Sequence, residues 1–433
     1  MGSDKKVSPS ADISIGNEVN LFIKYIDSLA DTLPRTAFAI GLAQYGVLKE
    51  FMAFVEKHTD LQGLADDKIV LQIPHDSFGK FQKLYQGIEK SVYSSKLVLR
   101  SFIISLISQY DAFLGRLVRA LFLIQPDSLN ISERNITFAQ LQTFESVEDA
   151  REYIIEKEIE TVLRKSHFEQ FDWLEKKFDI KLHEGLNIWQ TFIEVTERRN
   201  LFVHNSGIVT GQYLNVCKMH NVELDEDIHI GVELEATPDY FKKAYECIFE
   251  IGVKLAQVLW RKVEPADRER ADKNLNNICY ELLVEERFRL ACILLDFATD
   301  LKRYSSDQWR RTFIVNRAQA YKWSGDFEKA KKIVTNEDWS AASDKFKLAE
   351  AVILDDFDRA DGLVKRIGSS DDILNKNTYR EWPLFREYRK SEGFPRAFEE
   401  VFKEPLQKEP LQLVDIDVTQ VKSPLGDFQK ILA

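Results

Sequence analysis

The chain has 433 residues, 44% apolar and 30% charged, so it can bury a large core and is too apolar to remain disordered. Its formal net charge of −11 excludes a protein that binds nucleic acid through its overall charge, so any contact with RNA or DNA has to be local. The 4 cysteines lack the spacing of disulfides or paired zinc ligands, which favours a reducing, cytoplasmic environment.

The first 94 residues predict a leader followed by helices. Residues 1–16 have no apolar signal segment and are expected to be a flexible leader. Two helical patterns follow, with Pro34 expected to end the first of them. Residues 68–74 are short, β-branched and closed by a proline, so they are the best early strand candidate. We therefore expect residues 17–94 to be an N-terminal helical segment with one short strand.

The most apolar stretch, residues 97–124, is long enough to raise the question of a membrane span. Asp111 and three arginines interrupt it, and burying several charges in lipid is costly. The stretch therefore predicts a helix in a protein core, and we expect no membrane association.

The segment TERRNLFVHNSG, residues 196–207, places a histidine near the end of an expected helix. Asn200 and His204 are four residues apart and share one face, whereas Arg199 lies alongside on a long side chain. Gly207 is well placed to end the helix, which puts His204 in the last turn, where free carbonyl groups favour a charged imidazolium. This combination predicts a group that exchanges protons beside a fixed positive charge.

RRNLFVHNSG resembles the R-x4-6-H motif of the HEPN family, in its R-N-x-x-x-H form. The order of the surrounding helices agrees over residues 95–263, including a long apolar helix with Asp111 in its middle. The resemblance implies an all-α bundle that dimerises through the motif helices and, in active members, a metal-independent ribonuclease. It assigns Arg199 and His204 as the motif pair, Asn200 as their polar companion and Asp111 as the acidic partner.

The residue types suit RNA cleavage through the 2′-hydroxyl of the substrate. Such cleavage needs a proton taken from that hydroxyl, charge compensation at the phosphate and a proton given to the leaving oxygen. Arg199 suits the phosphate, and His204 suits proton transfer, with Asp111 orienting either of them. One histidine per chain is few for separate acid and base, so we expect a homodimer to combine two copies in one cleft, without metal or cofactor. Arg198 is expected to contact phosphate or solvent.

Three other interpretations of the motif stay open. An arginine in a surface ion pair with a residue such as Glu194, and a histidine that caps carbonyl groups, would give the same spacing by chance. Inactive HEPN-like domains also serve as dimerising scaffolds. Nucleotide binding, or regulation of a partner nucleotidyltransferase, is a third alternative. The usual motifs of nucleotide hydrolases, dehydrogenases, zinc proteases and α/β-hydrolases are absent from the sequence.

Residues beyond Gly207 predict a loop with a small hairpin, then a helix over 239–263 and a domain boundary at Pro265. Cys217, His220 and His229 could start a zinc site, although an ordinary loop fits their spacing better. The remaining histidines are expected at the surface; they are His58, His75, His167 and His183.

Residues 264–403 contain a recurring pattern in which alanine follows phenylalanine by three positions. The copies begin at Phe288, Phe327, Phe357 and Phe394, at intervals near the roughly 34 residues of stacked helix pairs. The second copy, NRAQAYKWSGDFEKA, resembles the tetratricopeptide repeat around its Gly325 turn. Elsewhere the match is weaker, because Asp355 replaces that glycine, and a chance recurrence within a helical bundle is the alternative. Residues 404–433 are expected to be an extended tail.

Together these features predict an all-α protein with minor β structure, in which a HEPN-like bundle precedes a domain of helical-hairpin repeats. The expected function is RNA cleavage by the effector of a bacterial toxin or antiviral defence system that acts by abortive infection. The expected partners are RNA, a second copy of the chain, and a protein or trigger bound by the repeats. The alternative is a non-catalytic dimerisation scaffold.

Overall fold

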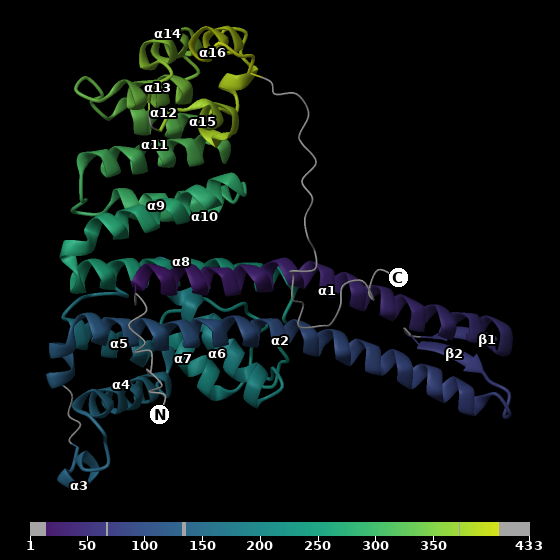
Figure 1. Ribbon diagram of the computed structural model, residues 1–433. Helices are drawn as coiled ribbons and strands as arrows, with labels where there is room; N and C mark the ends of the chain where they lie inside the picture. Colours follow the sequence, from purple (N-terminus) through teal and green to yellow (C-terminus); the bar gives the residue numbers. More distant parts are fainter. Residues whose placement is uncertain (1–13, 66–67, 132–135, 372, 407–433) are drawn as a thin grey trace, which may run out of the picture. The chain divides into compact units, whose positions relative to one another are not determined.

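The structure is a computed structural model that describes residues 14–65, 68–131, 136–371 and 373–406. Helices dominate these ranges, which confirms the all-α fold class (Figure 1). The chain separates into two compact units, one up to Phe313 and one from Ile314 onward.

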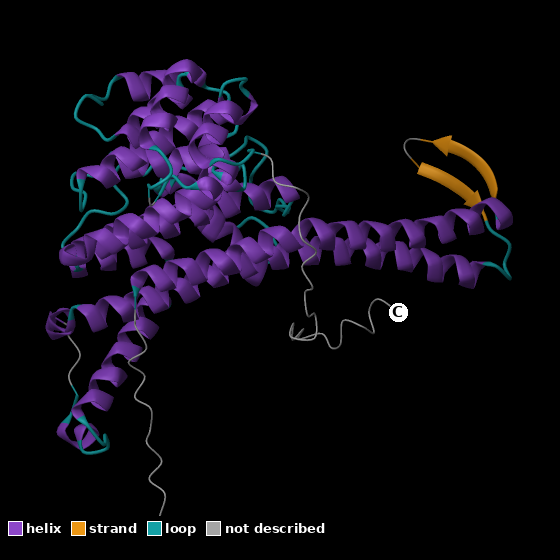
Figure 2. Ribbon diagram, turned by 45° about the horizontal axis from the view of Figure 1, so that its top comes forward, coloured by secondary structure: helices purple, strands orange, loops and turns teal. Residues whose placement is uncertain are grey.

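Two long helices and a pair of strands open the first unit. Helix α1 (Ile15–His58) and helix α2 (Phe78–Ile124) lie side by side, and strands β1 (Asp60–Ala65) and β2 (Lys68–Gln72) follow α1 at the end it shares with the start of α2 (Figure 2). The strands pair antiparallel, with Asp60 opposite Gln72. The strand predicted over residues 68–74 is confirmed, whereas its partner β1 had no clear alternation in the sequence.

Two predicted helix boundaries are wrong. Pro34 lies inside α1 and does not end it, and the core helix expected over residues 97–124 is the second half of a longer helix, α2, which begins at Phe78. Pro34 is exposed, so water can reach the carbonyl group that its missing N–H leaves free, while Leu33 beside it is buried. Helix packing on both sides of the proline outweighs its local cost.

The expected leader also ends earlier, since Ile15 and Gly16 are helical and buried. Residues 1–13 lie outside the described ranges.

Helix α8 (Pro238–Val263) is the centre of the first unit and is in contact with α1, α2 and α6. Thr237 caps its first turn by accepting a hydrogen bond from the Tyr240 N–H at 3.1 Å, and Pro238 follows at the first helical position, where no N–H is needed. Gly252 lets the ring of Phe22 from α1 approach the α8 backbone, and that ring stacks on Phe113 of α2 with 4.4 Å between centroids.

We expect Gly252→Ala to lower the free energy of unfolding by about 1–3 kcal/mol, because the added Cβ would overlap the buried ring of Phe22. Urea unfolding of the full chain measures the change. Gly46→Ala in α1 is the matched control, since a Cβ there meets nothing within 4 Å, and it should leave stability unchanged or raise it by up to ~1 kcal/mol. Equal effects of both substitutions would contradict this packing.

In the described part of the first unit, five shorter α-helices follow α2 before α8 begins, and α4 and α6 among them pack against α2. They are α3 (Phe138–Leu141), α4 (Val147–Leu163), α5 (His167–Phe178), α6 (Trp189–His204) and α7 (Gly211–Met219). Helix α7 occupies a segment expected to be a loop with a hairpin, of which only an isolated bridge between Ile208 and Glu233 is seen. Tyr213 and Cys217, four residues apart on α7, are both buried. Their shared face favours a helix, although the surrounding turn residues obscured it.

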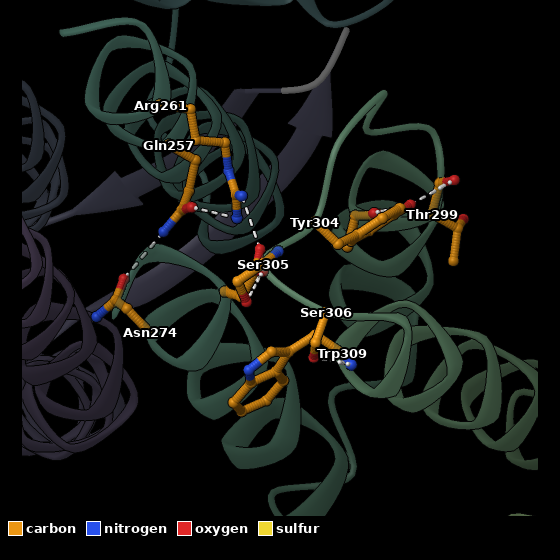
Figure 3. Close-up of polar contacts among 10 residues, drawn as sticks. Gln257, Arg261, Asn274, Thr299, Tyr304, Ser305, Ser306 and Trp309 are labelled. Atoms are coloured by element: carbon orange, nitrogen blue, oxygen red, sulfur yellow. Dashed lines mark hydrogen bonds and ion pairs between the residues drawn. The ribbon is translucent and has the colours of Figure 1, made fainter. Parts of the chain in front are cut away.

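The boundary expected at Pro265 is not where the chain divides, because α9 (Arg268–Val284) and α10 (Phe288–Thr299) belong to the first unit. Figure 3 shows the polar contacts that tie α9 to α8. Asp272 of α9 is fully buried, accepts from Arg261 Nη1 of α8 at 2.7 Å, and also accepts from the Ser305 N–H and hydroxyl at 2.7 Å each. Gln257 completes the contact by bonding both Arg261 and Asn274.

Helix α11 (Asp307–Trp323) includes the point where the chain divides into its units. The described part of the second unit then contains α12 (Phe327–Thr335), α13 (Asp344–Ile353), α14 (Phe357–Ile367), α15 (Lys376–Glu381) and α16 (Phe394–Phe402). Each phenylalanine of the recurring pattern is the first residue of a helix, namely α10, α12, α14 or α16. The alanines three positions later are all buried. The pattern therefore marks the same point in four helices.

The turns before three of these helices are also alike. Glu286, Gly325 and Asp355 each precede the phenylalanine by two positions and have left-handed φ angles of 57°, 98° and 59°. The next residue then donates its N–H to a carbonyl five positions back, at 2.8, 2.9 and 2.9 Å. A tetratricopeptide-like superhelix stays a prediction, and the last copy differs because short 3₁₀ segments separate α15 from α16.

By length and composition alone, α1 and α2 are long and apolar enough to cross a membrane, a property that core helices share. In the most apolar window of α2, 39% of the residues are buried in the protein, against 6% in that of α1. The expected tail lies outside the described ranges from residue 407 onward.

Candidate active site between α2, α5 and α6

Helix α6 ends as the sequence predicted. The N–H groups of Asn205 and Gly207 both donate to the carbonyl of Leu201, at 2.8 and 3.0 Å, and Gly207 has a left-handed φ of 83°. His204 is therefore in the last turn of the helix. A Cβ at Gly207 would lie 3.0 Å from both Arg100 Nη2 and the Leu234 carbonyl, so the turn requires glycine for space as well as for φ.

Arg100 of α2 fixes this turn to the following loop. Its Nη1 donates to the Ser206 carbonyl at 2.8 Å, and its Nη2 donates to Glu233 and, at 3.4 Å, to the Leu234 carbonyl. The Arg100 side chain is only 11% exposed. The pKa of Glu233 is lowered, first by its hydrogen bond with Arg100 and further by Lys96. The end of the motif helix is thus held by a charged group that was assigned no role in the sequence.

Asp111 of α2 joins two side chains from other helices. Its Oδ2 accepts from Arg199 Nη2 of α6 at 2.7 Å, and its Oδ1 lies 3.0 Å from His167 Nε2 of α5. The carboxylate is 28% exposed, and the Arg199 side chain 18%. The structure thus brings together the acidic residue and the arginine that the HEPN resemblance paired, and it adds a histidine.

The surface position expected for His167 is wrong. Its side chain is 6% exposed and lies beside the rings of Tyr110 and Phe192, with centroids 6.0 and 5.8 Å away. Ser166 and Glu169 form a capping box, so His167 is the first residue of α5 and points into the bundle. The Ser-x-x-Glu spacing was visible in the sequence and could have located this helix start.

These residues line an open pocket of about 510 Å³, together with Asn200 and His204. Arg164 and Lys165 add positive charge to its wall, and Glu197 adds a carboxylate. Burial raises the pKa of Glu197, an effect that the charge of His167 and a 3.3 Å hydrogen bond from Asn200 partly offset. The pocket therefore combines fixed positive charge with several groups that can exchange protons, which suits an anionic ligand.

Two buried polar atoms near the pocket have no hydrogen-bond partner within the described part of the chain. They are Arg199 Nε and Oε1 of Gln170, a residue that is 1% exposed and also lines the pocket. A donor and an acceptor left free in a pocket wall are groups that a bound ligand can satisfy. Neither Gln170 nor Glu197 was singled out in the sequence, because single polar residues on amphipathic helices carry no distinguishing pattern.

Arg198 lies apart from the other predicted site residues. Neighbouring side chains on a helix differ by about 100°, so Arg198 faces away from Arg199 and lines a different pocket. Its Nε donates to Glu194 at 2.6 Å, and its guanidinium stacks on the ring of Tyr240, 4.0 Å from the centroid. The ion pair considered for the motif arginine and Glu194 is therefore made by Arg198, and a contact of Arg198 with RNA would require it to leave these partners.

The zinc candidate does not assemble in the described residues, where the potential metal ligands that lie together are Asp172, Glu175 and His183. Cys217 is fully buried, and burial, followed by the charge of Glu194, raises the pKa of its thiol to about 11. Glu175 accepts hydrogen bonds from the N–H groups of Leu182 and His183 and contacts the ring of His183 at 2.8 Å, so its carboxylate serves a local turn.

Comparisons of the chain with protein-family models, with curated proteins and with solved structures give no match. The HEPN resemblance therefore rests on the motif residues and their arrangement.

Proposed function

We propose that the chain is a metal-independent endoribonuclease of the HEPN type, which cleaves RNA through the 2′-hydroxyl of the substrate. The main support is the contact chain His167–Asp111–Arg199 in a pocket that Asn200 and His204 also line. Groups for phosphate binding and for proton transfer thus face one space that is open to solvent.

Each group has a role in this chemistry. Arg199, held by Asp111, neutralises the charge that develops on the phosphate. His204 and His167 are the candidates for the base that accepts the 2′-hydroxyl proton and the acid that protonates the 5′ oxygen. Because one chain supplies both histidines, the need for a second copy to provide an acid and a base is smaller than the sequence suggested. The proposed steps call for no metal, since arginine and histidine supply the charge and the protons.

We further propose that two copies of the chain form a homodimer in which their α6 helices, which carry the motif, lie next to each other. Val203 and Ile208, on either side of His204, are 46% and 45% exposed. Large apolar side chains beside a polar pocket are typical of an interface that would place two pockets next to each other. In this arrangement the cleft combines Arg199 and His204 of both copies.

We further propose that the protein is the effector of a bacterial toxin or antiviral defence system, with its C-terminal helices binding a trigger or protein partner. The net charge of −11 supports an enzyme that does not bind RNA indiscriminately and cuts only where a substrate is positioned.

A scaffold without catalysis is the second candidate. The observation in its favour is that Arg199 already has an intramolecular ion pair with Asp111 at 2.7 Å. Such a pair holds α6 against α2 even if no substrate binds.

An RNA-cleavage assay in the presence of a chelator tests the proposal. The full chain is incubated with total cellular RNA, beside the variants His204→Ala and Arg199→Ala. His229→Ala and Arg116→Ala are the controls, since His229 is exposed and Arg116 pairs with Glu18 outside the pocket. We expect fragments with 2′,3′-cyclic phosphate ends from the wild type and the controls, and a loss of about 10²-fold or more in both pocket variants. Intact RNA with the wild type, or equal cleavage by all chains, would leave the scaffold as the function.

A further inference from the structure

The outer parts of α1 and α2 form an arm, defined as residues 35–58 and 78–98, which ends in the β1–β2 pair (Figure 2). Its two helices meet along a seam with heptad spacing. Contacts across the seam include Gln44 Nε2 donating to the Ser91 carbonyl at 3.0 Å and the rings of Phe51 and Phe81 at 5.6 Å. The seam residues are Ala37, Ile40, Gln44, Val47, Phe51 and Phe54 on α1, and Phe81, Leu84, Ile88, Ser91, Ser95 and Val98 on α2.

The seam of the arm is covered less well than the core. Nearly all of its residues are only half-buried, whereas Phe22 and Phe113, farther along the same helices, are fully buried. Two helices alone cannot enclose the side chains between them, and helical bundles solve this by adding helices. The arm therefore resembles two helices of a four-helix bundle from which the other two helices are missing.

One side of the arm is apolar, because large side chains follow immediately after seam residues. In an antiparallel helix pair, residues one position after the seam lie on the same side of both helices. The members of this apolar side are Phe38, Tyr45, Leu48 and Met52 on α1, and Phe78, Tyr85 and Val92 on α2, and they are 47–70% exposed. They recur at roughly heptad spacing along each helix, so they form two parallel stripes.

The opposite side of the arm, one position before the seam, is small or charged. On α1 it carries Ala39, Gly46 and Ala53, and on α2 it carries Lys80, Lys83 and Lys90, with Leu97 as an exposed apolar residue. Most charges of the arm thus avoid the apolar side, which reduces the repulsion that would oppose contact between two copies. Glu89 and Lys96 of α2 also follow seam residues, and Lys96 is paired with Glu233 at 3.3 Å.

A lipid bilayer fits the arm less well than protein does. Residues 36–48 of α1 carry no charge, but Lys49 and Glu50 follow, and a membrane span needs about 20 apolar residues. The paired helix α2 has several lysines between Lys80 and Lys96, which are costly in hydrocarbon. Heptad spacing on both helices aligns their apolar side chains with those of a packed helical partner. Contact with a bilayer does not require such spacing.

We propose that the apolar sides of two arms pack against each other, so that two copies of the chain form a four-helix bundle. The two surfaces are identical, and a predominantly apolar surface is complementary to itself about a two-fold axis. The exposed area of the side chains on one apolar side is on the order of 700 Å², near the ~800 Å² per partner of stable complexes. This inference is independent of the ribonuclease proposal and concerns a surface separate from the pocket.

The oligomeric state of the full chain tests this arm pairing. Sedimentation equilibrium over a range of concentrations compares the wild type with Phe38→Glu/Met52→Glu. The matched control is Ala39→Glu/Ala53→Glu, which places the same charges one position along the same helix on the opposite side of the arm. We expect the apolar-side variant to weaken self-association by about 100-fold or more, and the control to associate like the wild type. Circular dichroism checks that helix content is equal in all three.

Three results would overturn the arm pairing. The first is a monomeric wild type at micromolar concentration, the second is equal association of the two variants, and the third is flotation of the wild type with phosphatidylcholine–phosphatidylglycerol vesicles that is lost in Phe38→Glu/Met52→Glu. Val203→Glu beside the pocket separates this inference from the motif-helix dimer. If only Val203→Glu reduces the assembly, the arms do not pair and the ribonuclease proposal stands.

Discussion

Asp111→Asn should lower RNA cleavage by about 10²–10⁴-fold, the range contributed by a positioned proton-transfer group. Asparagine would keep the shape of the side chain and lose the charge that holds Arg199 at 2.7 Å and contacts His167 at 3.0 Å. Both groups would then be free to leave the positions that face the pocket. The rate of cleavage under single-turnover conditions is the quantity to measure, because it excludes product release.

Glu18→Gln is the control for this prediction. Glu18 of α1 accepts from Arg116 Nε of α2 at 2.7 Å, and the two side chains are 23% and 29% exposed, similar to the Asp111 pair. The control removes an equivalent ion pair without touching the pocket, and its cleavage rate should equal that of the wild type. Loss of activity in both variants would indicate a general effect on the bundle, and retention in both would remove Asp111 from the mechanism.

Glu194→Gln should lower the free energy of unfolding by about 3–5 kcal/mol, the cost of breaking a buried ion pair. The Glu194 side chain is 7% exposed and accepts from Arg198 at 2.6 Å, from Tyr213 at 2.9 Å and from Tyr240 at 2.8 Å. Glutamine retains the size of the side chain and leaves the guanidinium of Arg198 buried without a countercharge. Urea unfolding, with hydrogen exchange followed in α6 and α8, measures the loss and its location.

A double-mutant cycle identifies the ion pair as the cause. Glu194→Gln combined with Arg198→Met removes both charges. The double variant should lose less free energy of unfolding than the sum of the losses in the two single variants, by about 1 kcal/mol or more. Glu246→Gln is the control, because Glu246 pairs with Arg289, whose side chain is 76% exposed. This substitution should lower the free energy of unfolding by less than about 1 kcal/mol. Additive losses in the cycle would mean that Arg198 does not depend on Glu194.

Much of the fold was predictable because it depends on local periodicity. The core helix with Asp111, the end of α6 at Gly207 and the recurring phenylalanine–alanine pattern of α10, α12, α14 and α16 all follow from residues close in the sequence. The boundaries that failed depend on distant residues: packing on both sides of Pro34 keeps α1 intact, and buried Asp272 ties α9 to Arg261 of α8. Asp355 shows a further limit, because the structure adopts at an aspartate the left-handed turn expected only of a glycine.

The candidate site was predictable to the extent that family resemblance names residues. Arg199, Asn200, His204 and Asp111 do line one pocket, whereas Arg198 belongs to another. His167 was not found, because its role comes from a contact with Asp111, which lies on a different helix. Spacing along one helix says which residues share a face; it does not say which side chains of separate helices meet.

The packing of Phe22 against Gly252 has a consequence for synthesis of the protein. The chain between them is roughly 230 residues long, so at ~5–20 residues per second a ribosome needs on the order of 10–50 s to make it. Until α8 leaves the exit tunnel, the core-facing side of α1 has only the part of its native cover that α2 supplies. A nascent chain of this protein therefore has to be kept from aggregating for most of the translation of its first unit.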